Sequence, residues 1–326
     1  MTNQEVPRSF EYYANIEPRE VEWLWYPYIP YGKLTLIQGD PGEGKSTFVL
    51  QLISILTNGG ELPDGTNMSD CQIVIYQCAE DSKEDTIRPR LIMAGADCER
   101  VVFIPDQDEV LTLADARIER AIIDSKARLL VLDPIQAFLP QDVDMQSAAA
   151  MRGLMRNLAD IADRNSCAII LIGHMNKSTG GKKLYRGLGS IDIAAIARSI
   201  LLISRDEDSP EIRYMVPIKS SLAPEGPAIG FSLTEEHGFQ WIGTCDFSPV
   251  IVEEDSSLSS KKEKAKECLR LLLAENDIPS VEILKQMKEM NISPRTVRTA
   301  QKELGVMAYR KENAWYWHID KVKEND

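Results

Sequence analysis

The segment Gly39–Ser46, Gly-Asp-Pro-Gly-Glu-Gly-Lys-Ser, constrains the fold of this chain more than any other. The apolar run 33–38 before it predicts a buried strand, and the apolar run 47–53 after it predicts a helix. A strand, a glycine-rich loop and a helix N-terminus in this order surround a polyphosphate with backbone N–H groups. The chain is therefore expected to bind a nucleoside triphosphate.

Several residue types in this loop have a direct role in phosphate binding. The three glycines permit backbone angles and close approaches that a Cβ would forbid. Lys45 is placed to reach the β- and γ-phosphates, and the Ser46 hydroxyl is placed to ligate Mg²⁺. The expected cofactors are thus ATP and Mg²⁺. The expected nucleotide-binding residues are Gly39, Asp40, Pro41, Gly42, Glu43, Gly44, Lys45, Ser46 and Thr47.

Apolar strands and helical stretches alternate through the first 200 residues, which predicts an α/β fold with a mostly parallel, twisted sheet. The runs are almost continuously hydrophobic, as expected for strands buried on both faces. Later short runs predict an antiparallel extension. The predicted strands are 33–38, 72–77, 101–104, 128–133, 168–172, 199–204, 211–219, 228–233 and 238–242, and the predicted helices are 113–125 and 145–164.

Two acidic residues follow or end predicted strands. Asp133 ends the strand 128–133 in the form of a Walker B motif, and we expect it to hold a water on Mg²⁺ rather than only cap a turn. Glu80 follows the strand 72–77. Because the carboxyl ends of parallel strands face one crevice, Glu80 is expected to orient or deprotonate the attacking water. The alternative for Glu80 is a solvated loop acid.

Three further segments are candidates for contacts with phosphates or DNA. His174 follows the strand 168–172, where contact with the γ-phosphate and a structural role stay open. The glycine-rich, basic segment 178–190 contains Lys183 and Arg186 and suits contact with a polyanion, the alternative being a flexible surface loop. Lys219 ends a predicted strand and is a candidate to reach the γ-phosphate of a neighbouring subunit.

The ends of the chain differ from its centre. Residues 1–30 predict an irregular N-terminal arm, in which Trp23 or Trp25 either packs on the sheet edge or stacks on the nucleotide base. The ATPase domain is expected over 31–248. The serine-rich, charged stretch 249–261 predicts a linker.

Residues 262–320 predict a small winged helix-turn-helix domain. Helical stretches at 262–275, 279–290 and 293–304 precede a hairpin at 306–310 and 314–319. Ser293 and Pro294 supply an N-cap and a first-turn proline for the recognition helix. Arg295, Arg298 and Lys302 on that helix are the expected DNA contacts, and protein docking is the alternative.

Composition limits the other classes of function. The net charge is −13, but residues 261–326 hold 14 Lys and Arg against 11 Asp and Glu, so a localised nucleic-acid contact is favoured over general coating. The six cysteines contain no Cys-x-x-Cys pair, which argues against a zinc site. No apolar run approaches the roughly 18 residues of a membrane span, and no signal peptide is evident. A cytoplasmic protein without membrane contact is expected.

Taken together, the motifs resemble a RecA-like P-loop ATPase of the RepA-type hexameric replicative helicase group. The matching pieces, within residues 20–245, are the phosphate loop, Ala79–Asp81, Leu130–Pro134, Gly173–Lys177, Arg186–Ser190 and Lys219–Gly226. The resemblance implies that Glu80 is the catalytic base and that the site is completed between subunits, with Lys219 acting in trans. It also implies that Lys183 and Arg186 face DNA. RadA-like repair ATPases share the core, but this chain lacks their zinc ribbon and their Lys-Asn-Arg-Phe-Gly sequence.

Two functions follow as hypotheses. The first is a homo-oligomeric ATPase, expected to be a ring and as large as a hexamer, that moves along or remodels DNA, with single-stranded DNA as the expected partner. The second is an ATP-switched DNA-binding regulator or initiator that reads duplex sequence through its winged helix and does not unwind DNA.

Overall fold

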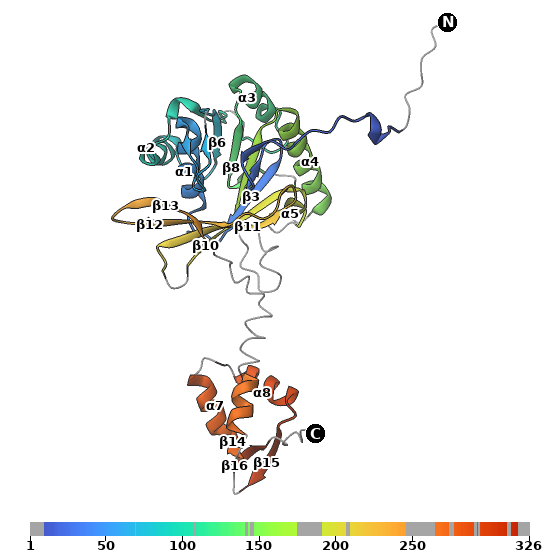
Figure 1. Cartoon of the computed structure of the whole chain (residues 1–326), viewed down its shortest axis with the longest axis vertical. Coiled ribbons are helices and arrows are strands. Elements are labelled where there is room, and N and C mark those ends of the chain that lie inside the picture. The colour runs from blue at the N-terminus through green and yellow to red at the C-terminus, as the bar shows by residue number, and fades with distance from the viewer. Residues whose placement is uncertain are drawn as a thin grey trace. The chain divides into compact units, whose positions relative to one another are not determined.

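A nine-stranded sheet runs through the first of the two units of this computed structural model, Met1–Ser248 and Pro249–Asp326 (Figure 1). In sheet order the strands are β13 (Gly238–Cys245), β12 (Ala228–Thr234), β11 (Ile212–Ser220), β10 (Ser199–Arg205), β3 (Leu34–Gly39), β9 (Ala168–His174), β8 (Leu129–Asp133), β6 (Val74–Cys78) and β7 (Val101–Val102). The structure describes residues 10–68, 70–106, 109–140, 143, 147–174, 191–206, 209–245, 265–273, 277–289, 292, 294–311 and 314–318.

The strands from β10 to β7 pair in parallel, whereas β10 to β13 pair antiparallel. This arrangement confirms the predicted mostly parallel sheet with an antiparallel extension. The central strands β3 and β8 are buried along their whole length. Their continuous Leu, Ile and Val content is what two covered faces require.

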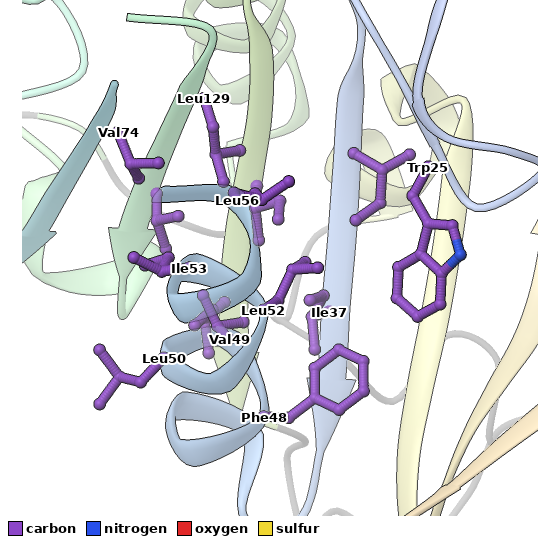
Figure 2. Packing of buried hydrophobic residues seen from close by; sticks show 14 of the residues in the cluster. Trp25, Ile37, Phe48, Val49, Leu50, Leu52, Ile53, Leu56, Val74 and Leu129 are labelled. Carbon is purple, nitrogen blue, oxygen red and sulfur yellow. The ribbon is translucent and has the colours of Figure 1, made fainter. Parts of the chain in front are cut away.

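Helices cover both faces of the sheet. The helices are α1 (Lys45–Asn58), α2 (Arg88–Ala94), α3 (Arg117–Ser125), α4 (Ala148–Arg164) and α5 (Ile191–Ile196). Helices α1 and α2 share one hydrophobic cluster with the sheet, and α3, α4 and α5 share the other. In Figure 2 the apolar side chains of α1, from Phe48 to Leu56, lie against Ile37 of β3 and Leu129 of β8. This packing fixes the helix that begins at the phosphate loop.

Residues near the N-terminus form a hairpin where an irregular arm was expected. Strand β1 (Trp23–Trp25) pairs with β2 (Ile29–Pro30). Trp25 is 1% exposed, and its ring stacks on that of Phe48 with centroids 6.4 Å apart. Of the two alternatives for Trp25, core packing is therefore the one observed.

Two predicted elements are shorter than expected. Strand β7 stops at Val102 because the buried Gln77 side chain takes both backbone bonds of Ile104, accepting from its N–H at 2.9 Å and donating to its carbonyl at 3.2 Å. Helix α3 begins at Arg117 rather than 113, since the Asp115 carboxylate accepts from the Arg117 N–H and forms a turn there. Both differences arise from side chains that replace regular backbone pairing.

The remaining short elements of the first unit lie at the surface. They are the hairpin β4 (Gly60–Glu61) with β5 (Asn67–Met68), the 3-10 turns Tyr13–Asn15, Cys98–Arg100 and Ile135–Phe138, and a π-helical turn at Lys83–Ile87. Across the part of the chain that the structure describes, no helix combines the length and the apolar character needed to cross a bilayer.

The second unit has its own small core. After helical residues 265–272 come β14 (Ile278–Pro279), α7 (Ser280–Glu289), α8 (Pro294–Glu303) and the hairpin β15 (Met307–Lys311) with β16 (Ala314–His318). Strand β14 adds a third strand in the order β14-β16-β15. Trp317 of β16 packs with Leu269, Ile283 and Val297.

Candidate nucleotide-binding site

The phosphate loop leaves the carboxyl end of β3 and enters α1 through two left-handed glycines. Gly42 has φ +81° and Gly44 has φ +89°, which a residue with a Cβ adopts only with strain. Gly39 is required for another reason, because a Cβ there would lie 2.4 Å from the carbonyl oxygen of Ile203 on β10. Asp40 and Pro41 are exposed at the start of the turn.

Lys45 is 4% exposed, and its Nζ donates to the carbonyl oxygens of Gly39 at 2.8 Å and Asp40 at 2.9 Å. Burial lowers the pKa of Lys45, while the charges of Asp133, Asp40, Glu43 and Glu80 act in the opposite direction. A buried ammonium surrounded by acids is ready to bind an anion. Ser46 and Thr47 follow it in the first turn of α1, partly exposed.

The parallel register brings the predicted acids to this same edge of the sheet. Gly39 pairs with His174, the last residue of β9, and Asp133 is the last residue of β8. Asp133 pairs with Cys78 of β6, so Glu80 follows at the same end. The order across the edge is therefore phosphate loop, His174, Asp133 and Glu80. The His174 side chain lies outside the described part of the structure.

The two acids have different surroundings. Asp133 is 5% exposed, and its carboxylate accepts a hydrogen bond from the Tyr76 hydroxyl at 2.7 Å. Glu80 is exposed. The next residue, Asp81, pairs with Arg90 of α2 at 2.7 Å. A buried, oriented carboxylate thus stands beside a solvent-accessible one.

Two arginines of the antiparallel extension contact the phosphate loop from the other side. Arg205 donates to the Gly42 carbonyl oxygen at 3.0 Å and lies 3.8 Å from the Glu43 carboxylate. Arg213 is buried, and its Cδ would lie 3.5 Å from a Cβ on Gly44. Burial lowers the pKa of Arg213, as does the nearby charge of Arg205, while Glu43 raises it.

Lys219 lies toward the opposite edge of the sheet, near the amino ends of β3 and β10. It pairs with Ile200, close to the start of the parallel ladder of β10. Its Nζ donates to the last carbonyls of α5, at 2.8 Å to Ala194 and 2.7 Å to Ala197. Lys219 therefore caps a helix of its own chain and does not meet its own phosphate loop.

The predicted DNA contacts are only partly described. Lys183 and Arg186 lie outside the described residues, as does the side chain of Arg295. Arg298 and Lys302 are both exposed on α8. The seven-residue span from position 295 to 302 places these three positions on one side of a helix. The predicted DNA-contacting residues of the two units are not brought together by any described contact.

Tyr76, Arg205 and Arg213 were missed by the sequence reasoning. For Arg205 and Arg213 no local signal exists, because their contacts cross strands that are far apart in sequence. Tyr76 carried a weak signal: it is a polar aromatic within an apolar strand that ends beside Glu80. Buried tyrosine hydroxyls usually have a partner, so an acid on a neighbouring strand could have been sought.

Comparison with known proteins agrees with this geometry. A family model described as an AAA domain, AAA_25, matches residues 3–180. The DNA repair protein RadA of Streptococcus pyogenes is 30% identical over 149 residues, 45% of this chain and 28% of the relative. RadA of Halalkalibacterium halodurans is 31% identical over 159 residues, 47% of this chain and 30% of the relative. The matched region thus spans less than a third of these relatives.

Among solved structures, the ATPase domain of a helicase matches with a TM-score of 0.50 at 14% identity, over 65% of this chain and 85% of that one. A KaiC-like protein of Pyrococcus horikoshii matches with a TM-score of 0.48 at 17% identity, over 67% of this chain and 95% of that one. At such identities the helicase-domain match speaks for the fold alone. With a strand, phosphate loop and helix inside a large, mostly parallel sheet, and with the family model covering more than half its length, this chain belongs to the AAA_25 family of AAA domains and has a RecA-like P-loop ATPase fold.

Proposed function

We propose that this chain is a Mg²⁺-dependent ATPase that works as an oligomer on DNA, as a RepA-like replicative helicase or DNA-remodelling ATPase. One observation carries the ATPase part. The Lys45 ammonium lies close enough to the Asp133 and Glu80 carboxylates for both charges to act on its pKa. A phosphate-binding cation and two strand-end acids at one edge are the parts that phosphoryl transfer requires.

The residues present fit a polyphosphate and a divalent cation. The loop carbonyls that accept from Lys45 are neutral, so a phosphate oxygen is a stronger partner for the ammonium. Ser46 and Asp133 offer hard oxygen ligands, which Mg²⁺ prefers together with phosphates and waters. When bound, Mg²⁺ supplies charge neutralisation at the phosphates.

Glu80 and His174 complete the proposed site. Glu80 is exposed beside Asp133, where a carboxylate can orient the attacking water and accept its proton. His174 is paired in register with Gly39, so it is proposed to respond to the γ-phosphate. Lys45 is proposed to stabilise the charge that develops on the transferred phosphoryl group.

The oligomeric part of the proposal rests on Lys219. Its side chain is held near the amino ends of β3 and β10, away from the phosphate loop of its own chain. A role at a nucleotide therefore requires a neighbouring copy. We propose a closed ring, with a hexamer as the expected size.

DNA is the proposed partner, single-stranded within the ring. The support is the basic segment containing Lys183 and Arg186, the exposed Arg298 and Lys302 on α8, and the names of the relatives, which concern DNA repair. We propose that Pro249–Asp326 is a winged helix that brings α8 to DNA. Arg295 is proposed to join these contacts.

Lys45→Ala tests the ATPase assignment. The expected result is loss of ATP turnover with and without DNA, because the buried ammonium is removed from the phosphate site. Retained DNA-stimulated turnover would contradict the assignment. Mass measurement with a non-hydrolysable ATP analogue, with and without single-stranded DNA, tests assembly. A monomer under all conditions would overturn the ring.

The alternative function is an ATP-switched DNA-binding regulator. The exposed basic side of α8 is the observation in its favour. A strand-displacement assay separates the two functions. ATP-dependent unwinding supports the motor, whereas sequence-selective duplex binding without unwinding supports the switch.

A further inference from the structure

Tyr76 and Asp133 lie on neighbouring parallel strands and are one diagonal step apart. Tyr76 of β6 pairs with Val131 of β8, and Cys78 pairs with Asp133. Side chains two residues apart share one face of a strand, so Tyr76 and Asp133 both face the α1 side, as do Val74, Tyr76, Leu129 and Val131 in the cluster around that helix. A diagonal neighbour is about 7–8 Å away, a distance that only a long or aromatic side chain spans. The phenol ring of Tyr76 spans it.

The contact between them is a short hydrogen bond in a buried setting. The Tyr76 hydroxyl donates to Asp133 Oδ2 at 2.7 Å, and the two residues are 3% and 5% exposed. Burial raises the pKa of Tyr76 well above its ordinary value, and the Asp133 charge raises it further. The hydroxyl therefore stays protonated over the whole working range of pH and is a permanent donor.

Within the described residues, Tyr76 is the one side chain that donates to the Asp133 carboxylate. The backbone of Asp133 is held separately, since its carbonyl accepts from the Ala79 N–H at 3.2 Å. The main chain is thus fixed by the sheet, and the side chain by Tyr76. Oδ1 is left available to accept from a water on a cation.

We propose that Tyr76 is a positioning residue for the metal site: its hydroxyl fixes the Asp133 carboxylate through Oδ2 and so presents Oδ1 toward Mg²⁺ and its waters. The proposal rests on the proposed metal role of Asp133. Partners that orient a metal-binding carboxylate change metal affinity or activity by about 10–100-fold when removed. Loss of the Tyr76 hydroxyl leaves Asp133 free to turn and deprives it of its buried partner.

The chain offers a closely matched control in Tyr28. Its side chain is 1% exposed, and its hydroxyl donates to the Pro227 carbonyl at 2.8 Å. Tyr76→Phe and Tyr28→Phe each remove one hydroxyl from the same hydrophobic cluster and keep the ring. Only the first removes a partner of Asp133.

Three quantities are measured on the full chain for both variants. They are Mn²⁺ affinity in the presence of a non-hydrolysable ATP analogue, read by electron paramagnetic resonance, the affinity for the same analogue in EDTA, and ATP turnover against Mg²⁺ concentration. For Tyr76→Phe we expect about tenfold weaker Mn²⁺ binding and a matching rise in the Mg²⁺ concentration for half-maximal turnover. Analogue affinity in EDTA stays unchanged, and Tyr28→Phe resembles the parent chain in all three.

The proposal is overturned if Tyr76→Phe binds Mn²⁺ as the parent does, or if both variants lose the same amount. The Mn²⁺ readout also separates this proposal from the proposed function. A parent chain that binds Mn²⁺ with the analogue but never hydrolyses ATP would contradict the ATPase assignment alone. The comparison of the two variants would still decide the role of Tyr76.

Discussion

The Nη2 of Arg205 donates to the carbonyl oxygen of Gly42 at 3.0 Å, linking the end of β10 to the tip of the phosphate loop. Gly42 has no neighbour within 4 Å of a Cβ position, so this bond is a main restraint on the peptide that follows it. The same guanidinium lies 3.8 Å from the Glu43 carboxylate. The antiparallel extension therefore takes part in shaping the loop.

Arg205→Ala is expected to weaken ATP binding severalfold. The loop then has more conformations to lose on binding, and one hydrogen bond of typically about 0.5–1.5 kcal/mol is gone. Isothermal titration with ATP in EDTA measures the change. Arg120→Ala, at an exposed position on α3, removes the same charge elsewhere and should leave the affinity unaltered. Equal losses in both variants would point to net charge instead of the Gly42 contact.

Gly39→Ala is expected to destabilise the fold. The added Cβ meets the Ile203 backbone oxygen at 2.4 Å, and neither strand can move without disturbing the ladder. Overpacking of this kind costs about 1–3 kcal/mol of unfolding free energy, measured by urea denaturation. Gly153→Ala in α4 is the control, because nothing lies within 4 Å of its Cβ position. That exposed helical site should gain up to about 1 kcal/mol. An unchanged midpoint for Gly39→Ala would contradict the close contact.

Lys219→Met is expected to loosen the end of α5. The ammonium donates to three carbonyls there, and methionine keeps the aliphatic length without a donor. Faster amide exchange over 191–197, measured by mass spectrometry in the absence of nucleotide, is the expected result. Lys126→Met at the C-terminal cap of α3 should not alter exchange in α5. Unchanged exchange in Lys219→Met would show that the cap is dispensable.

Cys167 predicts a loss of stability at alkaline pH. Burial raises the pKa of its thiol from 9.0 to about 12. The unfolded chain ionises this thiol first, so the contribution is complete below pH 9.0 and is lost progressively up to about pH 12. At one unit above the unfolded pKa the loss is about 1.4 kcal/mol. Cys167→Ala should show a fall in unfolding free energy between about pH 7 and about pH 10 that is smaller by about that amount. An identical fall in both chains would contradict a buried neutral thiol.

Elements with a strong local pattern were predictable from the sequence. The phosphate loop and the strand ending in Asp133 stand where their composition placed them, because each depends on neighbours in sequence. Strand β7 was predicted two residues too long, since no local pattern shows that Gln77 pairs with the Ile104 backbone. Hydrophobicity predicts burial, but it does not predict which buried polar group replaces a strand.

The contacts that refine the site depend on long-range register. Tyr76 reaches Asp133 across 57 residues of sequence, and Arg205 reaches Gly42 across 163. Which side chains meet across such separations is decided by strand order, which the sequence pattern leaves open. The interpretation of Lys219 as a residue directed at phosphate likewise gave no sign that its ammonium is bound by the end of α5.

Strand β11 carries Arg213 near its first residue and Lys219 near its last. It is paired with β10 along its length and with β12 over its first part, so its two ends behave as one stiff body. Six residues of strand span roughly 20 Å. A shift of the phosphate loop that displaces Arg213 is therefore delivered, with little loss, at the other end, where Lys219 holds α5. In a ring of identical copies this strand acts as a lever between successive nucleotide sites, and the expected signature is cooperative turnover that disappears when Lys219 is replaced.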